Sequence, residues 1–304
     1  MPVVLVHGNP ETAAIWDELR KELGRDDVIA LSPPGFGAPV PEGFGATSDD
    51  YLAWLIAELE KIDGPIDLVG HDWGGGHVMR LAIERPDMVR SWCTDIGGCF
   101  DPEYAWHDAA QVWQTPEAGE AAVAGMAAAP VEARTAQFQS LGMSPEAAAN
   151  VAAAVNADMA RCILALYRSA AQPRLAEIGK DVGKAKVKPG LVIIATEDHY
   201  TGGETLARRT AERAGAKVAM LDGLGHWWMC QDPKRGAAAL NRVLRGLWCR
   251  ARPRSRHAPA GSCDCAAPTS SDRQHDLSVA GCSRAQPLPC GGGYVGALAP
   301  PEPV

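Results

Sequence analysis

The sequence has no hydrophobic run long enough to cross a membrane. A membrane-spanning helix needs about 20 consecutive, mostly apolar residues, and the 304-residue chain contains no such stretch. The chain starts Met1-Pro2 and passes directly into an apolar run, without the basic and apolar regions of a signal peptide. From these absences we expect a cytoplasmic protein with no membrane partner.

Positive charge is in the minority. The chain has 29 Lys and Arg against 37 Asp and Glu, which gives a formal net charge of -8 at pH 7. Such a surface repels both the phosphates of nucleic acids and the headgroups of anionic lipids. We therefore expect no nucleic acid and no anionic membrane surface among its partners.

Cysteine and histidine do not recur at the spacings of a metal site. The densest arrangement is one Cys-x-Cys, Cys263 and Cys265, with scattered partners, which is too sparse for zinc. We predict no metal and no cofactor. The cysteines before residue 249 fit buried or free thiols of a cytoplasmic protein; they are Cys93, Cys99, Cys162 and Cys230.

Residues 249–304 lack any apolar periodicity. Arginine recurs at positions 250, 252, 254 and 256, and the rest is mostly Ala, Pro, Ser, Gly and Cys with a single aromatic residue, Tyr294. A segment of this composition cannot bury enough apolar surface to fold. We predict that it is a disordered tail, and a frameshifted or read-through end would have the same composition.

A serine is missing where the most informative motif would usually have one. The pentapeptide Gly70-His71-Asp72-Trp73-Gly74 follows an apolar run at 66–69 and precedes a helical pattern at 75–84. Strand, sharp turn and helix are the setting of a nucleophile elbow, with Asp72 at the nucleophile position. The alternative is an ordinary strand-to-helix turn in which Asp72 is the N-cap of the helix.

An aspartate nucleophile indicates substitution at a saturated carbon. A serine that attacked such a carbon would form an ether, which water cannot cleave. A carboxylate instead forms an alkyl ester, and that ester contains the enzyme's own carbonyl carbon as a target for water. The elbow therefore favours an epoxide or an alkyl halide as the substrate over an ordinary ester.

Further segments supply the other groups that this chemistry needs. His7-Gly8-Asn9-Pro10 follows an apolar run at 3–6, and the backbone N–H groups of Asn9 and Trp73 are the expected oxyanion hole. Asp198 follows a predicted strand at 190–195, and His226 lies in a loop after another at 217–221. The chain order is nucleophile, acid, histidine, as in elbow hydrolases.

The His7–Pro10 motif, the elbow, Asp198 and His226 together resemble the α/β-hydrolase superfamily, and most closely its epoxide hydrolase and haloalkane dehalogenase branch. The resemblance covers about residues 1–248. It implies a cis Asn9-Pro10 peptide bond and a packing role for His71. Some dehalogenases have the acid after the strand that follows the elbow helix, near Asp95, but the register favours Asp198.

The expected fold class is α/β, an α/β-hydrolase fold with a doubly wound, mostly parallel sheet and an inserted helical cap. Residues 1–98 and 186–248 form the core, and the Ala-rich residues 99–185 form the cap, which makes the apolar wall of the pocket. We expect strands near 3–6, 28–31, 66–69, 90–96, 190–195 and 217–221. Helices are expected near 13–23, 48–61, 75–84, 205–214 and 233–247.

The leaving group decides between the two chemistries. An opening epoxide needs a proton donor, and Tyr167 resembles the cap tyrosine of epoxide hydrolases, although it could also be core filling. A second cap tyrosine is missing near Ala109; Tyr104 and His107 are its neighbours. A halide needs weak N–H donors, and Asn9 and Trp73 resemble the halide-holding pair of some haloalkane dehalogenases.

The sequence thus predicts a cytoplasmic, cofactor-free hydrolase, a monomer or homodimer acting on a small apolar molecule. Its catalytic residues would be Asp72, Asp198, His226 and Tyr167, with Asn9 and Trp73 at the oxyanion or leaving group. Epoxide hydrolysis to a diol is the first interpretation, and haloalkane dehalogenation is the second. A third is a hydrolase-fold binding protein without turnover, because a fold alone does not determine function.

Overall fold

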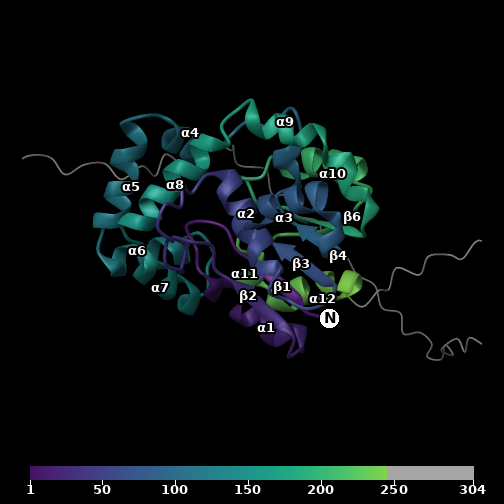
Figure 1. The fold of residues 1–304 in the computed structure, drawn as a ribbon. Helices are drawn as coiled ribbons and strands as arrows, with labels where there is room; N and C mark the ends of the chain where they lie inside the picture. Colours follow the sequence, from purple (N-terminus) through teal and green to yellow (C-terminus); the bar gives the residue numbers. More distant parts are fainter. Residues whose placement is uncertain (245–304) are drawn as a thin grey trace, which may run out of the picture. The chain divides into compact units, whose positions relative to one another are not determined.

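Six apolar segments form a single sheet in the computed structural model, which describes residues 1–244 (Figure 1). The strands are β1 (Val3–Val6), β2 (Val28–Leu31), β3 (Ile66–Gly70), β4 (Val89–Thr94), β5 (Gly190–Ala195) and β6 (Lys217–Leu221). Their order in the sheet is β2-β1-β3-β4-β5-β6, and every pairing is parallel. The predicted α/β fold class is confirmed, while the predicted tail at 249–304 lies outside the described residues.

Helices cover both faces of the sheet because successive side chains of each strand point to opposite faces. In β1, Val3 and Leu5 belong to one buried cluster, together with residues of α1 and α12. Val4 and Val6 belong to a second cluster, together with residues of α2, α3 and α10. The helices are α1 (Asp17–Leu23), α2 (Ser48–Leu59), α3 (Trp73–Glu84), α10 (Gly203–Arg213) and α12 (Pro233–Leu244).

The observed boundaries differ from the predicted ones by a few residues where turns interrupt the pattern. The predicted helix at 13–23 is two elements, a 3-10 turn (Ala13–Trp16) followed by α1. The predicted strand at 90–96 ends at Thr94, because Ile96 has φ -103° and ψ 30° and leads into a 3-10 turn (Gly97–Phe100). The elbow helix α3 starts at Trp73, directly after Asp72.

The interval between β4 and β5 contains α4 (Asp108–Gln114), α5 (Ala118–Ala128), α6 (Val131–Ser140), α7 (Pro145–Ala154), α8 (Ala157–Ser169) and α9 (Arg174–Lys180). In Figure 1, α4 to α8 lie beside the strand-bearing part and α9 lies next to α10. The whole described chain belongs to one compact unit. The division into core and cap therefore stays a prediction, and we call α4–α9 the helical segment.

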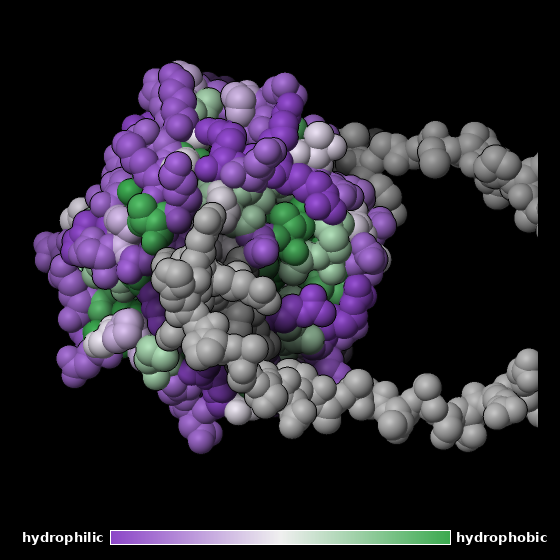
Figure 2. Space-filling view, turned by 90° about the vertical axis from the view of Figure 1, so that its right-hand side faces the viewer, coloured by the Kyte–Doolittle hydropathy of each residue, from purple (hydrophilic) through white to green (hydrophobic). Residues whose placement is uncertain are grey.

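Within residues 1–244 we find no single helix that is long and apolar enough to cross a membrane. The pair α7 and α8 would satisfy both criteria together, but a bend of 93° separates them. On the face shown in Figure 2, hydrophilic residues cover most of the described surface, and hydrophobic ones form small areas separated from one another.

Candidate active site

The backbone of the elbow holds Asp72 in a conformation that side chains rarely adopt. Asp72 has φ 49° and ψ -128° at the turn from β3 into α3, and such a conformation costs about 1–3 kcal/mol. Glycine makes the close approach to it possible, because a Cβ on Gly8 would lie 2.0 Å from Asp72 Oδ1. A Cβ on Gly74 would lie 2.2 Å from the backbone oxygen of Val6.

The two carboxylate oxygens of Asp72 have different environments. Oδ1 accepts a hydrogen bond of 3.0 Å from the backbone N–H of Asn9, and the Asn9-Pro10 peptide bond is cis, as predicted. Oδ2 lies 3.8 Å from His226 Nε2, beyond hydrogen-bond range. Burial raises the pKa of Asp72 to about 6, against the opposing charge of His226. One oxygen is thus held in place while the other remains free to react.

His226 is oriented by Asp198. The distance from His226 Nδ1 to Asp198 Oδ2 is 2.8 Å, and Asp198 Oδ1 accepts the N–H of Tyr200 at 2.9 Å. Burial alone would lower the pKa of His226, but the Asp198 carboxylate outweighs it and the pKa is raised. The pKa of Asp198 is lowered, because the charge and hydrogen bond of His226 outweigh the opposing effect of burial. With its proton on Nδ1, neutral His226 directs the lone pair of Nε2 toward Asp72.

Sequence reasoning missed a second polar cluster directly behind the elbow. His71, which was expected to serve in packing, has both ring nitrogens within hydrogen-bond distance of carboxylates. These carboxylates belong to Asp95 and Glu11, so Asp95 contacts His71 whereas Asp198 contacts His226. The polar residue Glu11 after the His7–Pro10 motif was the signal that could have indicated such a cluster.

Three side chains of this cluster lie close enough together to be ligands of a metal ion, but their hydrogen bonds argue against a metal site. Glu11, His71 and His226 each place one possible ligand atom within 4.8 Å of the others. A metal needs a free lone pair on an imidazole nitrogen, and both nitrogens of His71 already face carboxylate oxygens. We therefore assign no metal to these residues.

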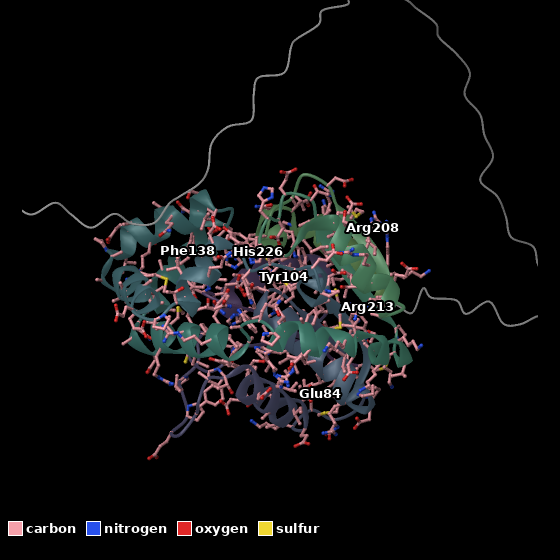
Figure 3. All side chains as sticks on the ribbon, turned by 90° about the horizontal axis from the view of Figure 1, so that it is seen from above. Glu84, Tyr104, Phe138, Arg208, Arg213 and His226 are labelled. Atoms are coloured by element: carbon pink, nitrogen blue, oxygen red, sulfur yellow. The ribbon has the colours of Figure 1, made fainter. Side chains whose placement is uncertain are left out.

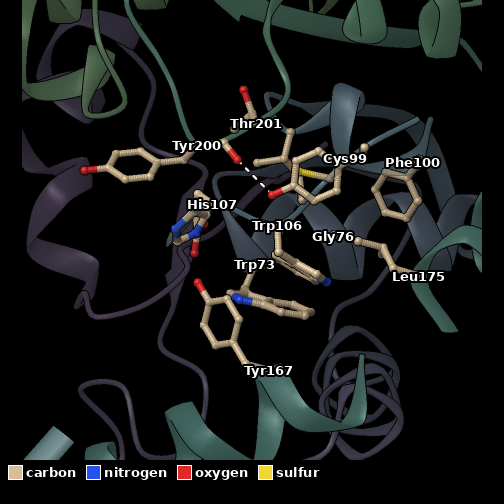
Figure 4. Close-up of a pocket in the computed structure, with 13 residues that line it drawn as sticks. Trp73, Gly76, Cys99, Phe100, Trp106, His107, Tyr167, Leu175, Tyr200 and Thr201 are labelled. Atoms are coloured by element: carbon tan, nitrogen blue, oxygen red, sulfur yellow. Dashed lines mark hydrogen bonds between the residues drawn. The ribbon is translucent and has the colours of Figure 1, made fainter. Parts of the chain in front are cut away.

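A pocket of about 30 Å³ opens beside Asp72 (Figure 4). Most of its wall is aromatic or apolar, although aromatic residues make up only 6% of the sequence. The lining residues are Asp72, Trp73, Gly76, Ile96, Cys99, Phe100, Tyr104, Trp106, His107, Tyr167, Leu175, Tyr200 and Thr201. In Figure 3, Tyr104 and His226 lie between Phe138 of α6 and Arg208 and Arg213 of α10.

Tyr167 lies at the end of α8 with its ring in the aromatic wall and its hydroxyl directed into the pocket (Figure 4). Its ring centroid is 5.2 Å from that of Trp73 and 4.8 Å from that of Trp113. The indole nitrogen of Trp73 lies toward this hydroxyl in Figure 4. An indole N–H can only donate, so it leaves the phenolic proton for a ligand. Burial and the charge of Asp72 hold the pKa of Tyr167 well above 10.

Tyr104 and His107, which lie near the position of the missing cap tyrosine, both line the pocket. They differ in whether they have a proton left to donate to a ligand. The Tyr104 hydroxyl donates to the backbone oxygen of Tyr200 at 2.9 Å (Figure 4). His107 Nδ1 accepts the N–H of Ala110 at 3.3 Å as the N-cap of α4. Since burial lowers the pKa of His107 to about 4, the ring is neutral and its proton is on Nε2.

Asn9 and Trp73, the predicted halide-holding pair, have different surroundings. The Trp73 indole lines the pocket, whereas Asn9 does not belong to the lining. Both polar atoms of the Asn9 side-chain amide are buried without a hydrogen-bond partner among residues 1–244. An unpaired buried amide is costly, so it is a group on which a ligand would have a large effect.

Known proteins match both the branch and the fold. Haloalkane dehalogenase 2 of Mycobacterium bovis is 36% identical over 29% of this chain and 32% of its own length. An epoxide hydrolase of Caballeronia sordidicola is 30% identical over 29% of each chain. The crystal structure of haloalkane dehalogenase DbeA from Bradyrhizobium elkani superposes with a TM-score of 0.61 at 19% identity, covering 81% of this chain and 91% of that one.

The sequence matches to curated relatives are partial. The chain spans about three tenths of the length of the dehalogenase and of the epoxide hydrolase. It spans 41% of the length of a succinate-derivative hydrolase of Acinetobacter baylyi. The family model has wider coverage, because it matches residues 3–239. The chain therefore belongs to the alpha/beta hydrolase family, as the elbow and the order of Asp72, Asp198 and His226 predicted.

Proposed function

We propose that the protein is an epoxide hydrolase that converts an epoxide into a diol through a covalent ester on Asp72. The observation that supports this most is that Asp72 and Tyr167 line the same pocket. One supplies a carboxylate and the other a hydroxyl that remains protonated and can donate to the opening oxygen. A nucleophile and an acid that face one cavity are what the opening of an epoxide requires.

In the first step, Asp72 Oδ2 attacks one epoxide carbon, and the carbon–oxygen bond to that carbon breaks. The released oxygen takes the proton of the Tyr167 hydroxyl, so no free alkoxide accumulates. The indole N–H of Trp73, which acts to lower the pKa of Tyr167 against burial, stabilises the negative charge that develops on the phenolic oxygen. The product of this step is an ester whose carbonyl oxygen is Oδ1.

In the second step, His226 Nε2 takes a proton from water, and the hydroxide adds to Cγ of the Asp72 ester. The charge that develops on Oδ1 is stabilised by the backbone N–H of Asn9, which already contacts this oxygen at 3.0 Å. Trp73, at the start of α3, is expected to supply the second N–H. Collapse of the tetrahedral intermediate breaks the bond between Cγ and the oxygen that is attached to the substrate carbon. That oxygen takes the proton of the hydroxyl added to Cγ and leaves in the diol, so Asp72 is again a carboxylate, and the proton on His226 passes to the Tyr167 phenolate.

His107 is the better candidate for the role of the missing second cap tyrosine. The hydroxyl proton of Tyr104 is already used on the carbonyl of Tyr200. The N-cap bond of His107 instead fixes its proton on Nε2, and the ring faces Tyr167 with centroids 6.3 Å apart. We propose that His107 donates a second hydrogen bond to the epoxide oxygen.

Haloalkane dehalogenation is the second proposal, and the unpaired amide of Asn9 favours it. A halide leaving from the attacked carbon would take weak N–H donors such as this amide and the Trp73 indole. Against it, the Trp73 indole nitrogen lies toward the Tyr167 hydroxyl (Figure 4), and Asn9 does not line the pocket. A binding protein without turnover is the third possibility, because the fold alone does not require catalysis.

Product analysis separates the three proposals. Purified protein is incubated with small apolar epoxides and with chloro- and bromoalkanes of similar size, and diol and halide are both measured. We expect diol from at least one epoxide. Halide release without diol would replace the first proposal by the second, and binding without either product would support the third.

The rate of the first step is expected to fall in acid and to stay level in mild base. Asp72 reacts only as a carboxylate, and its pKa is raised to about 6, so protonation removes the active form as the pH falls through 6. The pKa of Tyr167 is held well above 10, so its proton remains available up to about pH 9. A profile of kcat/KM against pH measures both limbs. An acid limb near pH 4 would show that Asp72 is not shifted.

A further inference from the structure

His71 is enclosed on two sides by carboxylates. Its Nδ1 lies 2.5 Å from Asp95 Oδ2, and its Nε2 lies 2.9 Å from Glu11 Oε1. The side chains of His71 and Glu11 are fully buried, and that of Asp95 is 3% exposed. An ionised carboxylate can only accept hydrogen bonds, so both ring nitrogens must donate. His71 is therefore an imidazolium ion, and the two carboxylates raise its pKa against the effect of burial.

Each of these carboxylates also accepts a backbone N–H, one from the turn at Asp72 and the other from the loop beside it. Glu11 Oε2 accepts the N–H of Gly8 at 2.9 Å, in the loop whose next residue, Asn9, contacts Asp72. Asp95 Oδ1 accepts the N–H of Asp72 itself at 3.1 Å. The strained turn at Asp72 and the loop that holds its Oδ1 are thus tied to the same ion cluster.

The same carboxylates hold the loop that contains His226. Glu11 Oε1 accepts the indole N–H of Trp227 at 2.6 Å, and Asp95 Oδ2 accepts that of Trp228 at 2.8 Å. The rings of His71 and His226 are 4.5 Å apart between centroids. Segments from four parts of the sequence, around residues 8–11, 71–72, 95 and 226–228, therefore meet at one buried cation.

We propose that Glu11, His71 and Asp95 form a buried ion triad in which the His71 cation is a positioning residue for Asp72 and His226 and sets the local charge around them. This goes beyond the proposed function, because it concerns the positions and pKa values of Asp72 and His226. These apply to an epoxide and to a haloalkane alike. The triad has a net charge of about -1, from two carboxylates and one imidazolium.

The groups that face His71 determine the sign of the effect. Besides Glu11 and Asp95, these are His226, Asp72 and His7. His7 is neutral in the physiological range because burial lowers its pKa to about 4. The His71 cation opposes protonation of His226 and favours ionisation of Asp72, whereas Glu11 raises the pKa of Asp72. Removing the cation or removing the Glu11 carboxylate should therefore shift His226 in opposite directions.

The test is a set of three variants read by the ring-nitrogen NMR signals of ¹⁵N-labelled histidine. In the unmodified protein, His71 should keep both nitrogens protonated from pH 5 to pH 9. His71→Gln makes the triad more negative and should raise the pKa of His226 by about one pH unit. Glu11→Gln should lower it by a similar amount. The double variant restores the net charge and should return the pKa to near its original value.

His199→Gln is the matched control, because His199 is exposed and lies outside the triad. A role in packing alone would shift His226 in the same direction in both single variants and would make their effects add in the double variant. Either result, or a His71 with one unprotonated nitrogen at neutral pH, overturns the proposal. If His71→Gln does not fold, Glu11→Gln still tests the sign of the effect, because an unchanged or raised pKa of His226 in that variant overturns the proposal.

These NMR measurements require no turnover, so they are distinct from the test of the proposed function. If no epoxide or haloalkane is converted, the proposed function fails while the triad is still judged by the His226 pKa. If turnover is found, kcat/KM should drop by about tenfold or more in His71→Gln, and its acid limb should move to higher pH because Asp72 becomes harder to ionise. An acid limb that stays in place would show that the cation does not tune Asp72.

Discussion

Replacing His226 with glutamine is expected to stop the reaction after its first step and to leave the substrate bound covalently to Asp72. Formation of the ester uses Oδ2 of Asp72 and the proton of Tyr167, and neither group needs the imidazole. Hydrolysis of the ester needs a base for water, and the nearest is His226 Nε2, 3.8 Å from Oδ2. Loss of a general base reduces a rate by about 10²–10⁴-fold, so the ester should accumulate.

Intact-mass measurement after incubation with a converted substrate should show an increase equal to the mass of the epoxide. For a haloalkane, the increase would equal the alkyl group in place of a proton, so the size of the adduct also reports the chemistry. Asp72→Asn should show no adduct, and the exposed control His199→Gln should turn over normally. An unmodified His226→Gln protein, with a substrate that the natural chain converts, would reject the covalent mechanism.

The main site could be predicted from the sequence because its residues follow strands. Asp72, Asp198 and His226 each lie just beyond the carboxyl end of a strand, and in a parallel sheet these ends meet at one edge. The apolar runs fixed the positions of the strands, and the glycines around Asp72 indicated the sharp turn. The register of the strand after the elbow helix favoured Asp198 over Asp95 as the acid, and the structure places Asp198 2.8 Å from His226.

The ion triad could not be predicted in the same way. His71 and Glu11 are 60 residues apart, and His71 and Asp95 are 24 apart. No periodicity connects these three positions, because they meet through turns that follow β1, β3 and β4. Asp95 could even be taken for an alternative acid, since residue type alone does not show which histidine a carboxylate contacts. Only the path of the backbone after Thr94 decides it.

The helical segment was the least predictable part of the site. Its Ala-rich sequence indicated helices but gave no information on which faces turn toward Asp72. The resemblance of the residues around Tyr167 to a known signature identified one wall residue, whereas Trp106 and Tyr200 had no comparable signal. Their contribution depends on how α4, α8 and the loop after Asp198 pack, and such packing between distant segments is set by tertiary contacts.

The choice of leaving group should be decided by two single substitutions with opposite effects. Tyr167→Phe removes the proton donor, so we expect epoxide turnover to fall by about a hundredfold or more. Displacement of a halide needs no proton and should change little. Asn9→Ala removes only the side-chain amide and leaves the backbone N–H that contacts Asp72 Oδ1 at 3.0 Å. It should therefore slow a halide reaction and leave epoxide turnover nearly intact.

Both variants are measured on one epoxide and one haloalkane, with thermal melting as the check on folding. Tyr167→Phe keeps the ring that packs on Trp73 and Trp113, so its melting temperature should remain close to that of the natural chain. Because the Asn9 amide has no partner among the described residues, its removal breaks no hydrogen bond there.

If Tyr167→Phe retains full epoxide turnover, the tyrosine is only a residue of the pocket wall. The opening oxygen must then take its proton from another group, and His107 is the next residue to replace. If instead Asn9→Ala abolishes the conversion of haloalkanes and the natural chain never forms a diol, the dehalogenase proposal takes the place of the first, because the orphaned amide then has the ligand that its burial requires.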